Sequence, residues 1–173
     1  TLAVYGSICR ETGRDFVFPG SPEQYEAVTD VTDARILARQ LEWAATEPAA
    51  ANQAFNIVNG DIFRWRRMWK IVAAGLGVEA ADYPGEPTPL VKQMANASEI
   101  WDHIVAKHDL QPYPVETLAS WWHSDADLGR TIETFTDMSK SRRVGFLEYQ
   151  ETSNSFLNLF DRLRAKRIIP PLG

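Results

Sequence analysis

The polar residues best placed to contact a ligand lie two-thirds of the way along the chain, next to a tryptophan pair that ends at Trp122. His123 follows directly, and Asp127 and Arg130 come four and seven positions later. A helix running through this stretch places all three on one face, and the imidazole changes charge near neutral pH. Gly129 is a predicted helix stop, which puts Arg130 at the boundary. Two readings stay open: the wall of a ligand pocket, or two core tryptophans beside a solvated polar edge.

The rest of the sequence gives little indication of a metal site or of a catalytic nucleophile. His103 and His108 are five residues apart and point to different helical faces, whereas a helical metal pair prefers a spacing of four. Cys9 is the only cysteine, which excludes a disulfide framework and a cysteine metal cage. Ser7 follows a glycine but lacks the strand–turn–helix elbow of a nucleophilic serine. We predict no metal site and no hydrolase.

Cofactor and proton-transfer motifs are also missing from this sequence. Gly75 and Gly77 follow a predicted helix, while a dinucleotide fingerprint needs a strand before it and a helix after it. Short-chain reductases pair a Tyr with a Lys four residues later so that the phenol can move a proton. None of the five lysines has a tyrosine four positions before it. We therefore predict no cofactor-binding and no catalytic residue in this chain.

A basic cluster begins the predicted long helix at Arg64, Arg66, Arg67 and Lys70. It could hold a phosphate, or it could be a solvated helix face that pairs with acids such as Asp61. The second interpretation is the more common one for such clusters.

Composition sets the broad class of the protein. The 173 residues are 45% hydrophobic, which indicates a globular domain with a real core. The net charge of −5 argues against nucleic acid as the main partner. No apolar run approaches the roughly 20 residues of a membrane span, and no signal peptide is recognisable. The single cysteine fits a reducing, cytoplasmic location.

The best-defined unit runs from Ala54 to Gly77 and reads strand, turn, helix. Phe55, Ile57 and Val58 form a short apolar run that ends at an Asn-Gly turn. Helical spacing then begins, and one apolar stripe contains Trp65, Met68, Trp69, Val72 and Leu76. Gly77 is the expected helix end. Such a unit must dock its strand and its helix on a sheet.

The stretches before this unit alternate between helix and strand. We predict a helix from residue 1 to Gly13, a strand at 16–18, an extended piece at 24–31, and a helix capped by Thr32 that buries Ala34, Leu37, Leu41 and Ala44. This order is typical of an α/β protein with a parallel sheet. Two or three short strands leave the edges of such a sheet unpaired. The sequence also begins without Met inside an apolar helical pattern, so we expect it to start within a longer protein.

Everything after residue 77 is predicted to be loop and helix. Prolines mark 78–89 as a loop, and a capping box at 96–99 opens the next helix. Further helices are expected over 115–128 and over 131–140, and a last one, capped by Ser153, should bury Phe156, Phe160 and Leu163. We accordingly divide the chain into 1–77, an incomplete nucleotide-binding α/β domain, and 78–173, a helical substrate-binding lobe.

Several of these stretches resemble one known family in the family's own order. They are TLAVYGSICRETG, VTDVTDARILARQLEWAA, NQAFNIVNGDIFRWRRMWKIVAAGLGVE, LASWWHSDADLG, DMSKSRRVGFLEY and NSFLNLFDRLRAKRIIP. The chain resembles the C-terminal half of the progesterone 5β-reductase/iridoid synthase-like reductases, which are atypical extended short-chain dehydrogenases. The stretch from Glu79 to Met94 matches poorly.

The resemblance implies the following for the parent protein. It would be an NAD(P)H-dependent oxidoreductase that reduces an enone C=C bond or an aldehyde or ketone, with NADPH or NADH held by an N-terminal Rossmann segment. This chain would be its substrate-binding portion, mostly helical with two or three strands from the edge of the parallel sheet, and inactive alone. The expected partners are a small carbonyl or enone substrate, the protein's own N-terminal segment and a second copy in a homodimer. The alternative is a stand-alone helical module that binds a ligand or a protein without catalysis.

One substrate-contacting position can be carried over from the family. The family places a Phe directly after two Trp against the substrate, and here that position is His123. An ionisable residue replaces an apolar wall, and Asp127 and Arg130 fall near further pocket positions. The predicted substrate-binding residues are thus Trp122, His123, Asp127 and Arg130, and the substrate is expected to be smaller and more polar than a steroid.

Overall fold

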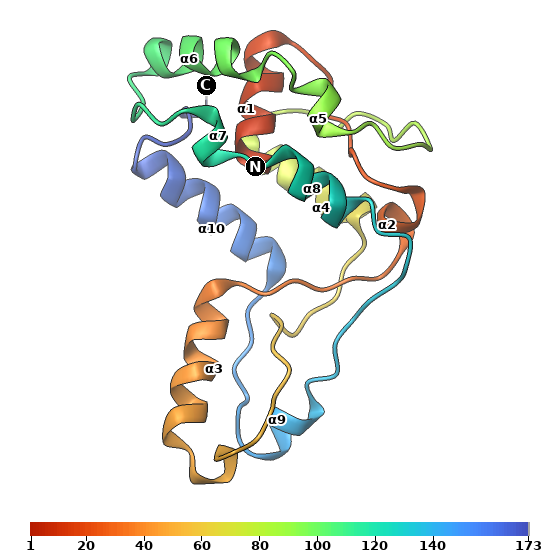
Figure 1. The fold of residues 1–173 in the computed structure, drawn as a ribbon, viewed down its shortest axis with the longest axis vertical. Helices are drawn as coiled ribbons and strands as arrows, with labels where there is room; N and C mark the ends of the chain where they lie inside the picture. The colour runs from red at the N-terminus through yellow and green to blue at the C-terminus, as the bar shows by residue number, and fades with distance from the viewer. Residues whose placement is uncertain (173) are drawn as a thin grey trace.

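The computed structural model describes residues 1–172 and is mostly helical (Figure 1). Within these residues the helices are α1 Leu2–Thr12, α2 Pro22–Glu26, α3 Ala34–Thr46, the 3₁₀-helix η1 Pro48–Ala50, α4 Trp65–Leu76, α5 Leu90–Gln93, α6 Ala97–His108, α7 Val115–Leu118, α8 Trp121–Leu128, α9 Ser139–Arg143 and α10 Thr152–Ala165. None of them is long and apolar enough to cross a membrane.

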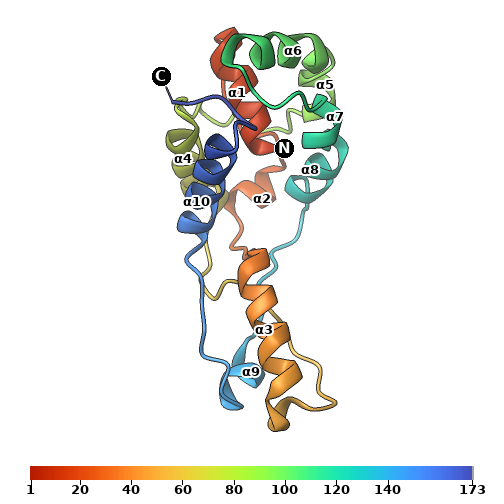
Figure 2. The same ribbon diagram turned by 90° about the vertical axis from the view of Figure 1, so that its left-hand side faces the viewer.

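The molecule is elongated and has a larger and a smaller part (Figure 1). The larger part contains α1, α2, α4 to α8 and α10, and the smaller part contains α3, η1 and α9. Extended connections join the two, and the view at right angles shows the same separation (Figure 2). The two buried clusters follow this division. Each cluster contains residues from before and after Gly77. The division of the protein into a nucleotide-binding domain and a substrate lobe at residue 77 remains a prediction.

Aromatic side chains form the centre of the larger part. Phe16 stacks on Trp69 with ring centroids 4.3 Å apart, and the Trp69 indole N–H donates to the carbonyl oxygen of Phe16 at 3.1 Å. Tyr5 lies 4.9 Å from the ring of Phe16, so α1 and α4 share this aromatic group. Stacked and tilted rings at such separations stabilise a core beyond the area that they bury.

Helix α4 confirms its predicted stripe, since all five apolar residues of the stripe are buried. Gly77 ends the helix in the left-handed conformation with φ 70°, as predicted. Two guanidinium groups satisfy carbonyls of the last turn. Arg10 donates to Leu76 O at 3.3 Å, and Arg164 donates to Gly75 O. These contacts connect α1 and α10 to the end of α4.

The smaller part has its own buried cluster of Ile36, Val58, Met138 and Phe146. Helix α3 contributes Ile36 and the buried Gln40, whose amide donates to Asn56 O at 2.9 Å. The predicted buried face of this helix is therefore wrong, because Leu37 and Leu41 are exposed. The helix carries apolar residues on two faces. The face that contains Ile36 packs on the segment around Phe146 and is buried.

Strands are not confirmed in the part of the chain that the structure describes. Extended segments pair only at isolated bridges, such as Phe16 with Ala80 and Thr29 with both Phe63 and Thr134. The segment predicted as extended at 24–31 begins instead inside α2, where Ser21 Oγ accepts from Gln24 N. The fold is thus mostly helical, without a resolved edge of a parallel sheet. Ladders need several adjacent extended neighbours, and residues 1–172 bring too few together.

The helix predicted over 115–128 is two short helices, α7 and α8, broken at Ala119 and Ser120. The helix predicted over 131–140 is wrong, because most of that stretch is extended and only α9 is helical. A contact to a distant side chain holds this extended stretch: Thr136 N–H donates to the Asp30 carboxylate at 2.6 Å. Helix α10 begins two residues earlier than predicted, with Glu151 rather than Ser153 at its cap.

Candidate functional site

Helix α8 brings the predicted polar residues together. His123 Nε2 lies 3.3 Å from Asp127 Oδ2, one helical turn away. The Arg130 Nε–H donates to the backbone oxygen of Asp127 at 2.9 Å, although α8 itself ends at Leu128. The predicted shared face is therefore confirmed for His123 and Asp127, while Arg130 lies past the end of the helix and donates back to it. The His123 and Asp127 side chains are 63% and 58% exposed, so this pair faces solvent.

Contacts on the opposite side hold α8 in place. The buried Leu128 has its carbonyl oxygen bonded to Ser21 N–H at 3.0 Å. Asp125 accepts the backbone N–H groups of Leu90 and Val91 at 2.7 and 3.0 Å, and so caps the first turn of α5. Fixed in this way, the helix can present His123 and its neighbours from a defined position.

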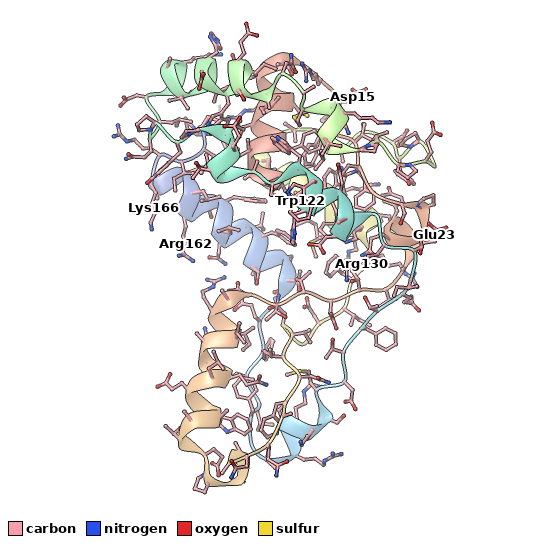
Figure 3. All side chains as sticks on the ribbon, viewed as in Figure 1. Asp15, Glu23, Trp122, Arg130, Arg162 and Lys166 are labelled. Atoms are coloured by element: carbon pink, nitrogen blue, oxygen red, sulfur yellow. The ribbon has the colours of Figure 1, made fainter. Side chains whose placement is uncertain are left out.

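The two tryptophans before His123 differ in environment. Trp121 is half-buried and packs against the main core, whereas Trp122 is 69% exposed. The Trp122 ring lies edge-on to His123, with centroids 5.4 Å apart, and Figure 3 labels it on α8. The reading of two core tryptophans is thus wrong for Trp122. Adjacent residues on a helix point in directions about 100° apart, so only one of the two tryptophans can face the core.

A small cleft contains two of the predicted residues. Asp127 and Arg130 line a space of about 170 Å³, whose other walls are Leu2, Thr29, Val31, Trp65, Ser124 and Leu128. His123 and Trp122 are outside its lining. Polar groups at the rim of an apolar cleft orient a ligand. A volume this small holds only one end of a substrate-sized molecule.

A second cleft lies beside the first, and Val31 lines both. It measures about 510 Å³ and lies between the start of α3 and α10. Its walls include Asp33, Asn59, Phe156, Leu159 and Arg162, and Figure 3 labels Arg162 on α10. Sequence reasoning missed these residues because they are distant in the chain, and no spacing pattern connects α3 to α10.

The glycines at the end of α4 do not form a site for a nicotinamide dinucleotide. Gly75 and Gly77 stand at the carboxyl end of α4, where exposed carbonyl oxygens repel a pyrophosphate. Two of those carbonyls already accept from Arg10 and Arg164. Within residues 1–172 no group of three or more His, Cys, Asp or Glu side chains is arranged to hold a metal ion.

Two buried ionisable groups belong to the core. Burial raises the pKa of the Cys9 thiol to about 11, and it raises the pKa of the Tyr5 phenol far above its usual value. The Tyr5 hydroxyl donates to Val17 O at 3.1 Å. A thiol held protonated is a poor nucleophile, so this pair has a structural role.

The fold and the α8 face together define a mostly helical chain compatible with the C-terminal lobe of an extended short-chain reductase. No protein-family model matches the chain. It is 39% identical over 171 residues to the (S)-8-oxocitronellyl enol synthase of Antirrhinum majus, covering 98% of this chain and 44% of the relative. It is 38% identical over 172 residues to the 3-oxo-Δ(4,5)-steroid 5β-reductase of Arabidopsis thaliana, with the same coverage. The synthase of Catharanthus roseus is 35% identical over 173 residues.

These matches confirm the predicted resemblance. The chain is homologous to a C-terminal part of the progesterone 5β-reductase/iridoid synthase-like reductases. It spans less than half the length of these relatives, at 44%, and they are named as a reductase and as enol synthases.

Proposed function

We propose that this chain is the substrate-binding portion of an NAD(P)H-dependent short-chain reductase that acts on an enone C=C bond or on an aldehyde or ketone. The observation that supports this most is the identity of 39% to an enol synthase across 98% of the chain. The α8 face, with His123 beside Asp127 and Arg130, is the proposed substrate side. Residues 78–173 are the proposed substrate lobe, and 1–77 the proposed end of the nucleotide-binding domain.

The cofactor belongs to another part of the proposed protein. NADPH or NADH would supply the hydride and would be held by an N-terminal Rossmann segment, because Gly75 and Gly77 stand at a helix C-terminus and form no dinucleotide fingerprint. A proton-donating Tyr and Lys would come from that segment too. The proposal includes a cytoplasmic location and a homodimer.

The polar α8 face favours a small polar carbonyl substrate over a steroid. Position 123 is ionisable where the family has an apolar wall, and the cleft beside it measures only about 170 Å³. Arg130 and Asp127 offer a donor and an acceptor to an oxygen-rich substrate end, and such groups reject an apolar analogue strongly because they would be left unpaired.

The test compares the 173-residue chain with the protein encoded by its complete reading frame. We expect the complete protein to oxidise NADPH with a small enone or aldehyde, and the 173-residue chain to show neither turnover nor NADPH binding by calorimetry. Turnover by the 173-residue chain alone would contradict the proposal that the cofactor and the proton donor are held by another segment. A reading frame without an upstream glycine-rich strand–turn–helix would favour the stand-alone binding module instead.

Substitution at position 123 then tests the substrate side in the complete protein. His123→Phe restores the family's apolar residue, and because His123 is exposed it should leave stability unchanged. We expect kcat/KM to shift from polar toward bulky apolar enones by roughly ten- to two-hundredfold, the range for one changed pocket contact. Asp102→Asn on α6 is the control. An unchanged ratio would contradict the placement of substrate at α8.

A further inference from the structure

A cleft at the start of α4 combines three arginines with an apolar wall. It measures about 440 Å³ and is lined by Val28, Asp61, Ile62, Phe63, Arg64, Arg66, Arg67, Met68, Ile71, Glu151 and Ser153. This volume lies within the range of roughly 300–1,000 Å³ for small-molecule sites. It shares no lining residue with the cleft at α8.

The carboxylates of this cleft are occupied by other partners. Asp61 accepts the backbone N–H and the hydroxyl of Thr152 at 2.9 and 2.6 Å. Glu151 accepts from Ser153 and Asn154 at 2.8 and 2.6 Å. Both acids thus fix the first turn of α10, and neither pairs with an arginine of the cleft among the described residues.

The three guanidinium groups differ in their contacts. Arg64 donates to the backbone oxygen of Glu26, and Arg66 lies 3.5 Å from the Glu26 carboxylate. Arg67 makes no side-chain hydrogen bond or ion pair within residues 1–172, and it is exposed. The Glu26 carboxylate pairs with Arg66, so Arg67 is the guanidinium of this lining that has neither a hydrogen bond nor an acidic partner among the described residues.

The apolar wall of the cleft is open to solvent as well. Ile62 is 62% exposed, and Phe63 and Ile71 are half-buried against the core. A guanidinium binds a carboxylate through two parallel N–H donors. We infer that this cleft binds a small organic monoanion, a carboxylate with an apolar body, whose head meets Arg67 and whose body covers Ile62.

Octanoate is the probe, added to the 173-residue chain with its isoleucine methyl groups labelled for NMR. We expect the Ile62 and Ile71 methyl signals to shift at millimolar octanoate, and calorimetry to give one site per chain. Acetate carries the charge without the apolar body, and 1-octanol carries the body without the charge. Each should bind about tenfold or more weakly, because a charge-assisted hydrogen bond and the buried chain both contribute.

Matched variants locate the charge. Arg67→Gln should weaken octanoate binding about tenfold or more, whereas Lys70→Gln, an exposed cation on the same helix outside the lining, should leave it unchanged. Ile62→Ser should weaken octanoate but not acetate. Unshifted Ile62 and Ile71 signals, equal binding by wild type and Arg67→Gln, or tighter binding of inorganic phosphate than of octanoate would each overturn the inference.

Discussion

Trp101 and Trp122 differ most sharply in environment among the tryptophans, and this difference can be tested. Trp101 is fully buried and donates its indole N–H to Tyr113 O at 3.0 Å, whereas Trp122 is exposed. Trp101→Ala should reduce the free energy of unfolding by about 3–5 kcal/mol, the usual cost of removing a buried large side chain. Trp122→Ala should stay within about 0.5 kcal/mol. Urea unfolding followed by circular dichroism measures both, and an equal cost would contradict the exposed position of Trp122.

Cys9 should be inert to thiol reagents in the folded chain. Its pKa is raised to about 11 by burial, and only the thiolate reacts. A disulfide reagent at pH 8 should label Cys9 at the rate of unfolding, and at once in denaturant. The raised pKa also means that this thiol contributes stability below its unfolded pKa, and that the contribution is lost as pH rises toward 11. Cys9→Ala should lack that alkaline loss, and rapid labelling of native protein would contradict the account.

At the scale of elements, α3 depends on the carboxylate of Asp33. The side chain accepts Arg35 N–H at 2.8 Å as the helix cap and pairs with the Arg35 guanidinium at 2.6 Å. This guanidinium holds the pKa of Asp33 well below its usual value. A lowered pKa contributes stability above the unfolded value of about 3.9, and the contribution is lost as pH falls through the folded value.

Acid unfolding of Asp33→Asn and wild type tests this contribution. The amide keeps a capping oxygen but does not titrate, so the variant should be less stable at neutral pH and should lose less stability below pH about 4. Asp102→Asn on α6 is the surface control. Parallel acid curves for wild type and Asp33→Asn would show that this cap is not linked to proton binding.

The end of α4 should depend on Arg164 more than on its exposed neighbour. Arg164 donates to Gly75 O and pairs with Asp161 at 3.0 Å, with its side chain only 15% exposed. Arg164→Met should cost about 1.5–3 kcal/mol, the value of hydrogen bonds made by a charged group. Arg162→Met removes a charge from an exposed position of the same helix and should cost under about 0.5 kcal/mol. Similar costs for the two would argue against a role for Arg164 at the helix end.

How far the sequence predicts each element depends on whether its signals are local. Helix α4 was predictable because its apolar stripe faces one side and Gly77 takes the left-handed conformation. Helix α3 has apolar residues on two faces, and only the packing of Phe146 and Met138 decides that Ile36 is buried. At the candidate site, spacing predicted the contact of His123 with Asp127. The exposure of Trp122 and the two clefts that Val31 lines depend on which distant segments pack nearby. The spacing of residues along the chain does not reveal that packing.

At the scale of the whole molecule, the larger part encloses most of the buried side chains, and the smaller part carries many exposed apolar ones. Neither the first helix nor the run at Phe55 and Ile57 forms a free apolar surface. Helix α1 is mostly buried, and Phe55 and Ile57 are half-buried. The exposed apolar residues of the smaller part lie on α3, on the connection before α9 and on the segment after α9.

Association of the chain through its smaller part is the expected consequence. Five apolar residues there are between 63% and 74% exposed, namely Leu41, Ile132, Phe135, Leu147 and Tyr149. Exposed apolar side chains and unpaired extended segments both favour association, so light scattering at high micromolar concentration should give a dimer or larger species. Leu41→Lys with Leu147→Lys should shift this species toward monomer, because each lysine places a charge in the contact. Val91→Lys on α5 in the larger part should not. A monomeric wild type, or an equal effect of Val91→Lys, would mean that the smaller part does not mediate association.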